Sequence, residues 1–264
     1  MAAGTSSSSN AERALDILLL LAAGSHDGMA LSEIAASLGT GKTVTHRSLQ
    51  ALMAKGFAES GTRHGHYRLG ASMGLLARAQ DRLRPHVARI RPGMVEFTRE
   101  TGYTTYLMIV AGLDAVCADI VSRHDARRSL MMGVGARVPL GIAGGSLALL
   151  SIMDEAEAER VMQANAARYA NYPALSEIDV DRIRSHVRDA RRRGFSVNFG
   201  LYFLGEGGLG LPLPAAGDSG MDMAVSFSLP VEYMSEAGMA ELIARLRKCI
   251  DDCIAEQSRN DPVG

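Results

Sequence analysis

The sequence predicts an α+β protein with an N-terminal winged helix-turn-helix, a linker helix and a C-terminal antiparallel sheet with packed helices. Two observations lead to this prediction. In residues 31–69, two short amphipathic helices flank a glycine turn and are followed by a hairpin. Beyond residue 100, a predicted hairpin at 103–121, three further predicted strands between 195 and 229 and the helices between and after them indicate an antiparallel sheet with helices packed on it.

The size and composition of the chain suit two domains in a reducing compartment. Its 264 residues exceed the usual size of one domain, and 47% of them are hydrophobic. The formal net charge is -1, so any affinity for nucleic acid must come from local basic clusters. Three cysteines are too few for a disulfide framework, so we expect a cytoplasmic protein. Cys249 and Cys253 lie one helical turn apart without a nearby histidine, so we expect apolar helix positions and no metal site.

The N-terminus is expected to hold a disordered polar tail, residues 1–9, and then a helix that Asn10 can cap. The apolar run 15–23 resembles the core of a signal peptide. However, little basic charge precedes this run, and Asp16 interrupts it. Because no stretch approaches the roughly 18 apolar residues of a membrane span, we expect neither export nor membrane insertion.

Residues 31–38 predict a supporting helix with one apolar face, and the two glycines of residues 39–41 predict the turn that ends it. A second helix is expected to begin at Lys42 or Thr43 and to end at Gly56. The residues expected to turn this second helix towards the core are Val44, Leu49 and Leu52.

The leading turns of the second helix carry side chains that can donate hydrogen bonds. Such a helix end suits insertion into the major groove of DNA, where base edges accept hydrogen bonds and phosphates supply charge. Segments 57–59 and 67–69 predict the strands of a wing with a basic tip. The candidate DNA contacts are Ser32, Lys42, Thr43, Thr45, His46, Arg47, Arg63 and His64. The alternative is a helix-turn-helix that packs against another protein and leaves its polar face in solvent.

Two glycine-containing segments resemble nucleotide-binding motifs. Residues 36–43 miss a P-loop only at their first position, but a helix precedes them where a P-loop follows a strand. Residues 205–210 satisfy G-x-G-x-x-G, yet the two prolines that follow cannot start the helix that a dinucleotide site needs. We therefore expect no nucleotide cofactor, and residues 205–210 remain either a flexible strand edge or a place of close ligand approach.

Residues 71–83 predict a further helix, whose apolar stripe suits packing on its own domain or on a second copy of the chain. Pro85 and Pro92 mark the join to the second part. We therefore divide the chain into a tail (1–9), the winged helix-turn-helix (10–70), a linker helix (71–84), a second domain (85–257) and a tail (258–264).

The second part is predicted to place six strands and five helices around a glycine-rich segment. The helices are expected at 87–101, from Ser146 to residue 153, and at 154–170, 179–193 and 233–255. The strands are expected at 103–110, 115–121, 129–132, 195–199, 208–213 and 221–229. Ser226 and Ser228 are two residues apart in a strand and therefore share one face. Gly144 and Gly145 precede a helix whose free amides favour an anion.

The order of these elements and their sequences together resemble the isocitrate-lyase-regulator (IclR) family of bacterial transcription regulators. In the first part, the resemblance rests on NAERALDILLLLA, LSEIAASLG, KTVTHRSLQALMAKGF and YRLG. In the second part, it rests on GARVPLGIAGGSLALLS, RRRGFSV and VSFSLP. The resemblance implies a GAF-like effector-binding domain, assembly into homodimers or homotetramers, and operator binding that a small metabolite, often a carboxylate or aromatic acid, modulates.

Carried over position by position, the resemblance also implies an effector site. Its residues are Gly144, Gly145, Asn198, Gly208, Ser226 and Ser228. This chain has Gly141 where the family usually has a histidine, and it lacks the usual glutamate after Asn198. The aromatic residues that could line the cavity are Tyr106, Phe199, Tyr202 and Phe203. We therefore expect an aromatic or other hydrophobic acid; alternatively, the two serines only satisfy local backbone groups.

These observations favour a DNA-binding transcription regulator that responds to a small molecule. No nucleophile with an adjacent base, carboxylate pair or metal-ligand cluster emerges, so we expect no catalytic residues and no enzyme activity. No cofactor is expected. A redox- or cofactor-sensing regulator of the same fold remains the first alternative, and an enzyme that uses the C-terminal domain remains the second. Repression and activation require the same contacts with DNA, so the sequence does not distinguish them.

Overall fold

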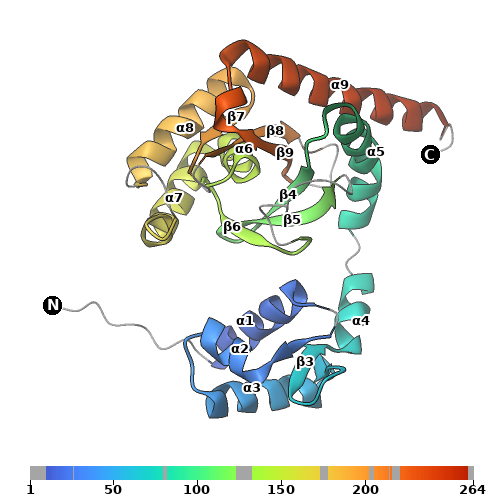
Figure 1. The fold of residues 1–264 in the computed structure, drawn as a ribbon, viewed down its shortest axis with the longest axis vertical. Coiled ribbons are helices and arrows are strands. Elements are labelled where there is room, and N and C mark those ends of the chain that lie inside the picture. The colour runs from blue at the N-terminus through green and yellow to red at the C-terminus, as the bar shows by residue number, and fades with distance from the viewer. Residues whose placement is uncertain are drawn as a thin grey trace. The chain divides into compact units, whose positions relative to one another are not determined.

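The computed structural model describes residues 10–25, 27–79, 82–122, 133–172, 178–201, 205–213, 215 and 221–260. It divides into two compact units, Met1–Asp81 and Arg82–Gly264, which are described separately (Figure 1). The α+β class, the N-terminal winged helix-turn-helix and the helix-covered antiparallel sheet are confirmed. Among the described helices, none has the length and apolar character needed to cross a membrane.

The first unit is a helix-turn-helix with a small three-stranded sheet. Its helices are α1 (Asn10–Ala23), α2 (Leu31–Ser37), α3 (Lys42–Ala54) and α4 (Ala71–Ala79). Its strands are β1 (Met29–Ala30), β2 (Ala58–Ser60) and β3 (His66–Leu69), in the antiparallel order β1-β3-β2. The two-residue strand β1 was not predicted because it has no pattern of its own and exists only through its pairing with β3.

The core of the first unit forms where α1, α2 and α3 meet the wing. Ile17 and Leu21 of α1 pack with Ile34 of α2 and with Leu49 and Leu52 of α3. Leu49 and Leu52 are three residues apart and therefore lie on one face of α3. Their burial orients α3 about its own axis, and this orientation decides which of its side chains reach solvent.

The second unit is a six-stranded antiparallel sheet with helices on both faces. Its helices are α5 (Leu83–Thr101), α6 (Gly144–Ile152), α7 (Glu155–Tyr169), α8 (Val180–Arg193), the 3-10 turn η2 (Val231–Tyr233) and α9 (Glu236–Asn260). Its strands are β4 (Thr105–Ala111), β5 (Asp114–Val121), β6 (Arg137–Pro139), β7 (Ser196–Phe199), β8 (Glu206–Leu213) and β9 (Met223–Pro230). Their order is β6-β5-β4-β9-β8-β7, and every neighbouring pair is antiparallel.

The two faces of this sheet carry separate cores. Helices α5 and α9 pack together on one face, with Phe97 against Phe227 at 4.9 Å between ring centroids. The nearly all-buried helix α6 lies on the other face, followed outward by α7 and α8 (Figure 1). Strand β9 supplies alternate residues to the two cores, since Phe227 belongs to one and Ala224 to the other. The predicted alternation in this strand is therefore confirmed.

Several predicted boundaries shift in the structure. Helix α5 begins at Leu83, four residues before the predicted start, because Pro85 lies in its first turn, where no backbone amide needs an intrahelical acceptor. Helix α6 begins at Gly144, so the two glycines form its first turn and do not precede it. The predicted strand at 129–132 lies outside the described residues.

Candidate functional site

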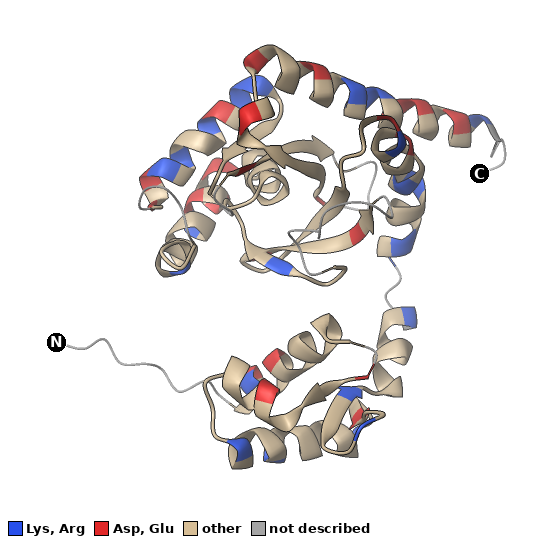
Figure 2. Ribbon diagram, viewed as in Figure 1, with Lys and Arg blue, Asp and Glu red and all other residues tan. Residues whose placement is uncertain are grey.

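The N-terminal end of α3 presents polar side chains to solvent. Lys42, Thr43, His46 and Arg47 are all exposed, and α3 carries no acidic residue, as Figure 2 shows. Seven of the eight candidate DNA contacts are exposed: Ser32, Lys42, Thr43, His46, Arg47, Arg63 and His64. A surface with donors and cations but without carboxylates can approach phosphates and base edges.

Thr45 is the exception, and its predicted contact with DNA is wrong. Its side chain is 0% exposed, because α3 turns Thr45 inward together with Leu49 and Leu52. The hydroxyl groups of Thr45 and Thr40 lie 2.8 Å apart in a hydrogen bond, and the Thr45 hydroxyl also donates to the Gly41 carbonyl at 3.2 Å. Conversely, Val44, which was predicted to face the core, is 39% exposed. A buried threonine satisfied by local partners has nearly the shape of valine, so apolar character alone assigned the two positions the wrong way round.

The burial of Thr45 leads to a test. We expect Thr45→Val to leave affinity for specific DNA within about twofold and to lower the free energy of unfolding by about 1 kcal/mol, because it removes two hydrogen bonds. Fluorescence anisotropy with a labelled duplex and urea unfolding would measure the two quantities. A tenfold loss of affinity without a loss of stability would place Thr45 at the interface after all.

The wing tip lies between β2 and β3 and exposes Arg63 and His64. Gly65, at φ +74°, turns the chain, and its carbonyl accepts a hydrogen bond from the amide of Leu31 at the start of α2. The tip is thereby tied to the helix-turn-helix. Arg68 of β3 is paired within the wing, since its guanidinium lies 2.8 Å from the Glu59 carboxylate.

The six residues of the expected effector site converge where α6 meets the sheet. Gly144 and Gly145 form the first turn of α6 over β8 and β9, and a Cβ on Gly145 would lie 2.7 Å from the Ser226 hydroxyl. In the sheet register, Gly208 stands between Asn198 and Ser228. The structure therefore brings together residues that are up to 84 positions apart, from Gly144 to Ser228.

Part of this cluster has a structural role. The Asn198 side chain donates to the Ile142 carbonyl at 2.8 Å and accepts from the Leu201 amide at 2.9 Å, so it bridges two loops. The Ser196 hydroxyl donates to the Gly144 carbonyl at 2.6 Å. These bonds hold α6 on the sheet, and they leave Asn198 with less capacity for a ligand than was expected.

The glycines of residues 205–210 allow the same close packing. A Cβ on Gly210 would lie 2.4 Å from the Gly144 carbonyl oxygen, and one on Gly208 would lie 3.3 Å from the Gly144 amide nitrogen. Gly145 has equally little room, since its Cβ would lie 2.6 Å from Met108 Cγ. Close approach of helix α6 therefore explains Gly208 and Gly210, whereas a Cβ on Gly207 would meet the Met234 side chain and Gly205 has a positive φ of +81°.

The helix N-terminus at the centre of the cluster offers free amides. The Ser146 hydroxyl accepts from the Ala143 amide at 2.8 Å and donates to the Ala143 carbonyl, so this serine caps the turn. The first amides of a helix have no intrahelical acceptor and carry the positive end of the helix dipole. An anion placed beside them would be stabilised without an arginine.

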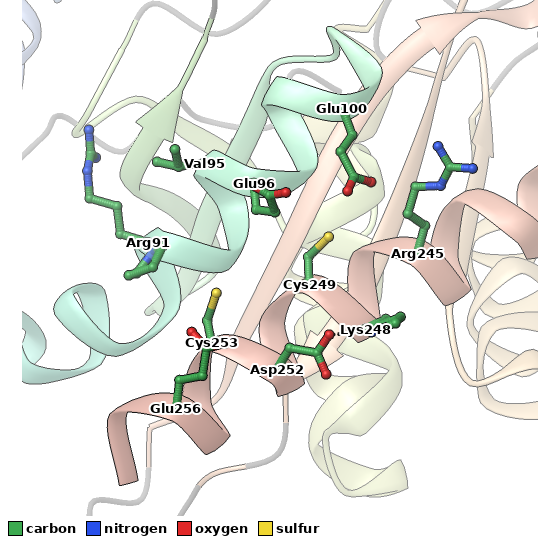
Figure 3. A pocket seen from close by; sticks show the side chains of 11 residues that line it. Arg91, Val95, Glu96, Glu100, Arg245, Lys248, Cys249, Asp252, Cys253 and Glu256 are labelled. Atoms are coloured by element: carbon green, nitrogen blue, oxygen red, sulfur yellow. Dashed lines mark hydrogen bonds and ion pairs between the residues drawn. The ribbon is translucent and has the colours of Figure 1, made fainter. Parts of the chain in front are cut away.

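A separate cavity of about 570 Å³ lies between α5 and α9 and contains two of the three cysteines (Figure 3). Burial raises the pKa of the Cys249 thiol, and Glu100 and Glu96 raise it further. Burial and Glu256 raise the pKa of Cys253 in the same way. Burial also raises the pKa of Cys117 to about 12. A raised pKa keeps a thiol protonated at neutral pH, and the protonated thiol is the less reactive form.

The described residues contain no group of three or more histidine, cysteine, aspartate or glutamate side chains that could hold a metal ion.

Two family models match the sequence. The IclR helix-turn-helix domain matches residues 10–61, and the C-terminal domain of the bacterial transcriptional regulator IclR matches residues 84–254. The chain belongs to the IclR family. It is therefore a DNA-binding transcriptional regulator with the two-domain organisation of that family.

Similar proteins match nearly the whole length of this IclR-family chain. The glycerol operon regulatory protein of Streptomyces griseus is 29% identical over 254 residues, which is 94% of each chain. Among solved structures, an IclR transcriptional regulator from Alicyclobacillus acidocaldarius has a TM-score of 0.69 at 22% identity and covers 93% of this chain and 97% of its own. An IclR homologue from Microbacterium hydrocarbonoxydans, complexed with 4-hydroxybenzoate, has a TM-score of 0.68 at 19% identity, with 94% and 100% covered. The structural matches show a shared fold.

Proposed function

We propose that this regulator binds operator DNA by laying the N-terminal end of α3 in the major groove. The observation that carries the proposal is the exposed, carboxylate-free end of α3 in a winged helix-turn-helix. Thr43, His46 and Arg47 face outward on this end and would contact base edges or phosphates. Lys42 and Ser32 would contact phosphates, and Arg63 and His64 of the wing would contact the backbone or minor groove.

The proposed DNA complex is symmetric, because one winged domain binds a short site only weakly. The helices α1 and α4 of the first unit expose several leucines: Leu15 at 61%, Leu19 at 44%, Leu75 at 68% and Leu76 at 56%. Exposed leucines on two helices are more simply explained by a second copy of the chain than by water. We therefore propose a homodimer, alone or as half of a homotetramer, that contacts two half-sites.

The proposed effector is a small carboxylate, in particular an aromatic acid, at the N-terminus of α6. Its carboxylate would face the free amides of Gly144 and Gly145 and the hydroxyls of Ser226 and Ser228. Tyr106 supports an aromatic ligand, since it lies opposite Ser226 in the β4–β9 register and belongs to the core beneath α6. The relative complexed with 4-hydroxybenzoate has the same fold. Phe199 is 43% exposed, and Tyr202 and Phe203 lie outside the described residues.

The experiment is a titration of operator binding by the full-length chain, with the DNA that flanks its own gene as the duplex. We expect 4-hydroxybenzoate to change the affinity and acetate or glycerol to change it less. Ser226→Ala should raise the half-effective concentration of the acid about tenfold, because a hydrogen bond to a charged group is lost. Ligand-free DNA affinity should remain unchanged.

Ser185→Ala, at an exposed position of α8, is the matched control and should respond like the unsubstituted chain. A response to glycerol alone would exclude an acid as the effector. An unchanged response of Ser226→Ala would place the ligand elsewhere. Absence of sequence-specific binding at any ligand concentration would contradict the proposed interface itself.

A further inference from the structure

Val44 is an exposed apolar side chain on the polar end of α3. It is 39% exposed, while its neighbour Thr45 is 0% exposed. At about 100° per residue, inward rotation of Thr45 turns Val44 away from the core and leaves it about 60° from Arg47 around the helix axis. Val44 therefore lies on the edge of the surface that Thr43 and Arg47 present to solvent.

The major groove has one apolar feature that such a side chain can recognise. Thymine carries a C5-methyl group there, whereas the other edges are hydrogen-bond donors and acceptors. A valine has neither a donor nor an acceptor, so it would desolvate a guanine, cytosine or adenine edge without replacing the lost hydrogen bonds. When the valine packs against a thymine methyl group, apolar surface of both groups is removed from water, which favours binding.

We propose that Val44 reads a thymine by packing against its C5-methyl group. This inference rests on the proposed insertion of α3 into the major groove. Residues three apart on a recognition helix contact neighbouring base pairs in zinc fingers, and Val44 and Arg47 have this spacing. If Arg47 contacts a base edge, the thymine therefore lies in the neighbouring base pair.

The test removes the methyl group without changing the hydrogen bonds of the base pair. A preferred duplex is first selected from a random library with the full-length chain, and each thymine is then replaced in turn by deoxyuridine. We expect one thymine in each half-site at which the replacement weakens binding about fourfold, the effect of about one buried methyl group. With Val44→Ala, the same replacement should have little effect, and affinities for the two duplexes should converge.

Val95→Ala is the matched control, because Val95 is 44% exposed and lies on α5 in the other unit. This variant should keep the fourfold discrimination. Circular dichroism of Val44→Ala would verify that α3 still folds. The inference is overturned if the unsubstituted chain tolerates deoxyuridine at every thymine, or if Val44→Ala discriminates as strongly as the unsubstituted chain. Selection that yields no preferred duplex would instead overturn the proposed function.

Discussion

Arg47→Ala is expected to weaken specific DNA binding by about 1–3 kcal/mol, the range for one good side-chain contact with a base edge. Arg47 is exposed on the second turn of α3, and no hydrogen bond or ion pair occupies its guanidinium among the described residues. Its five donors are therefore available to a guanine edge or to a phosphate. Anisotropy titrations with specific and scrambled duplexes at several salt concentrations would measure the loss.

The pattern of the loss identifies the contact. If Arg47 reads a guanine, affinity for the specific duplex falls and affinity for scrambled DNA changes little. If it contacts a phosphate, both affinities fall. The slope of log affinity against log salt concentration then decreases in magnitude by about one, because one fewer counterion is released. Arg188→Ala, at an exposed arginine of α8, controls for the change in net charge. Equal affinities of Arg47→Ala and the control for both duplexes would remove Arg47 from the interface.

Gly210→Ala is expected to lower the free energy of unfolding of the second unit by about 3 kcal/mol, at the upper end of the usual cost of overpacking. The new Cβ would lie 2.4 Å from the Gly144 carbonyl oxygen and 2.6 Å from the Ser196 hydroxyl. The first contact involves backbone, so α6 itself must move. The movement also disturbs the bond between Ser196 and Gly144. Urea unfolding followed by circular dichroism would measure the effect.

Gly74→Ala is the control for this substitution. Gly74 lies in α4, where a Cβ would meet nothing within 4 Å, and alanine favours a helix over glycine by about 1 kcal/mol. The control should therefore leave the first unit as stable as before or more stable. If Gly210→Ala unfolds at the same urea concentration as the unsubstituted chain, the stability of the second unit does not depend on the close contact between α6 and β8.

Local periodicity predicted the helices, strands and turns correctly where apolar residues face the core and polar residues face solvent. The turn at residues 39–41, helix α3 and the alternation in β9 were all predictable, because apolar spacing and glycine act over a few residues. The N-terminal end of α3 was harder. Thr45 reads as a DNA contact because it is polar, whereas the fold buries it and satisfies its hydroxyl with Thr40 and Gly41.

The effector cluster shows a second limit of local patterns. Local patterns supported only the two glycines and the two serines separately, and the six residues were expected as one site through the resemblance to a family, since positions from Gly144 to Ser228 carry no common periodicity. The structural role of Asn198 could not be foreseen, because both of its partners are backbone groups of loops that the fold brings to it. Likewise, the glycines of β8 left a flexible strand edge and a close ligand approach open, and only the structure shows that helix α6 lies against Gly208 and Gly210.

The sequence by itself determined the two-part organisation, the helix-turn-helix with its wing and the two-faced strand β9, since each follows from contacts between near neighbours in the chain. The tertiary structure alone decided how far α3 is rotated and how tightly α6 lies on the sheet. Both depend on packing between elements distant in sequence. The rotation exposes Val44 in place of Thr45, and the tight packing brings Gly145 of α6 against the side chain of Ser226.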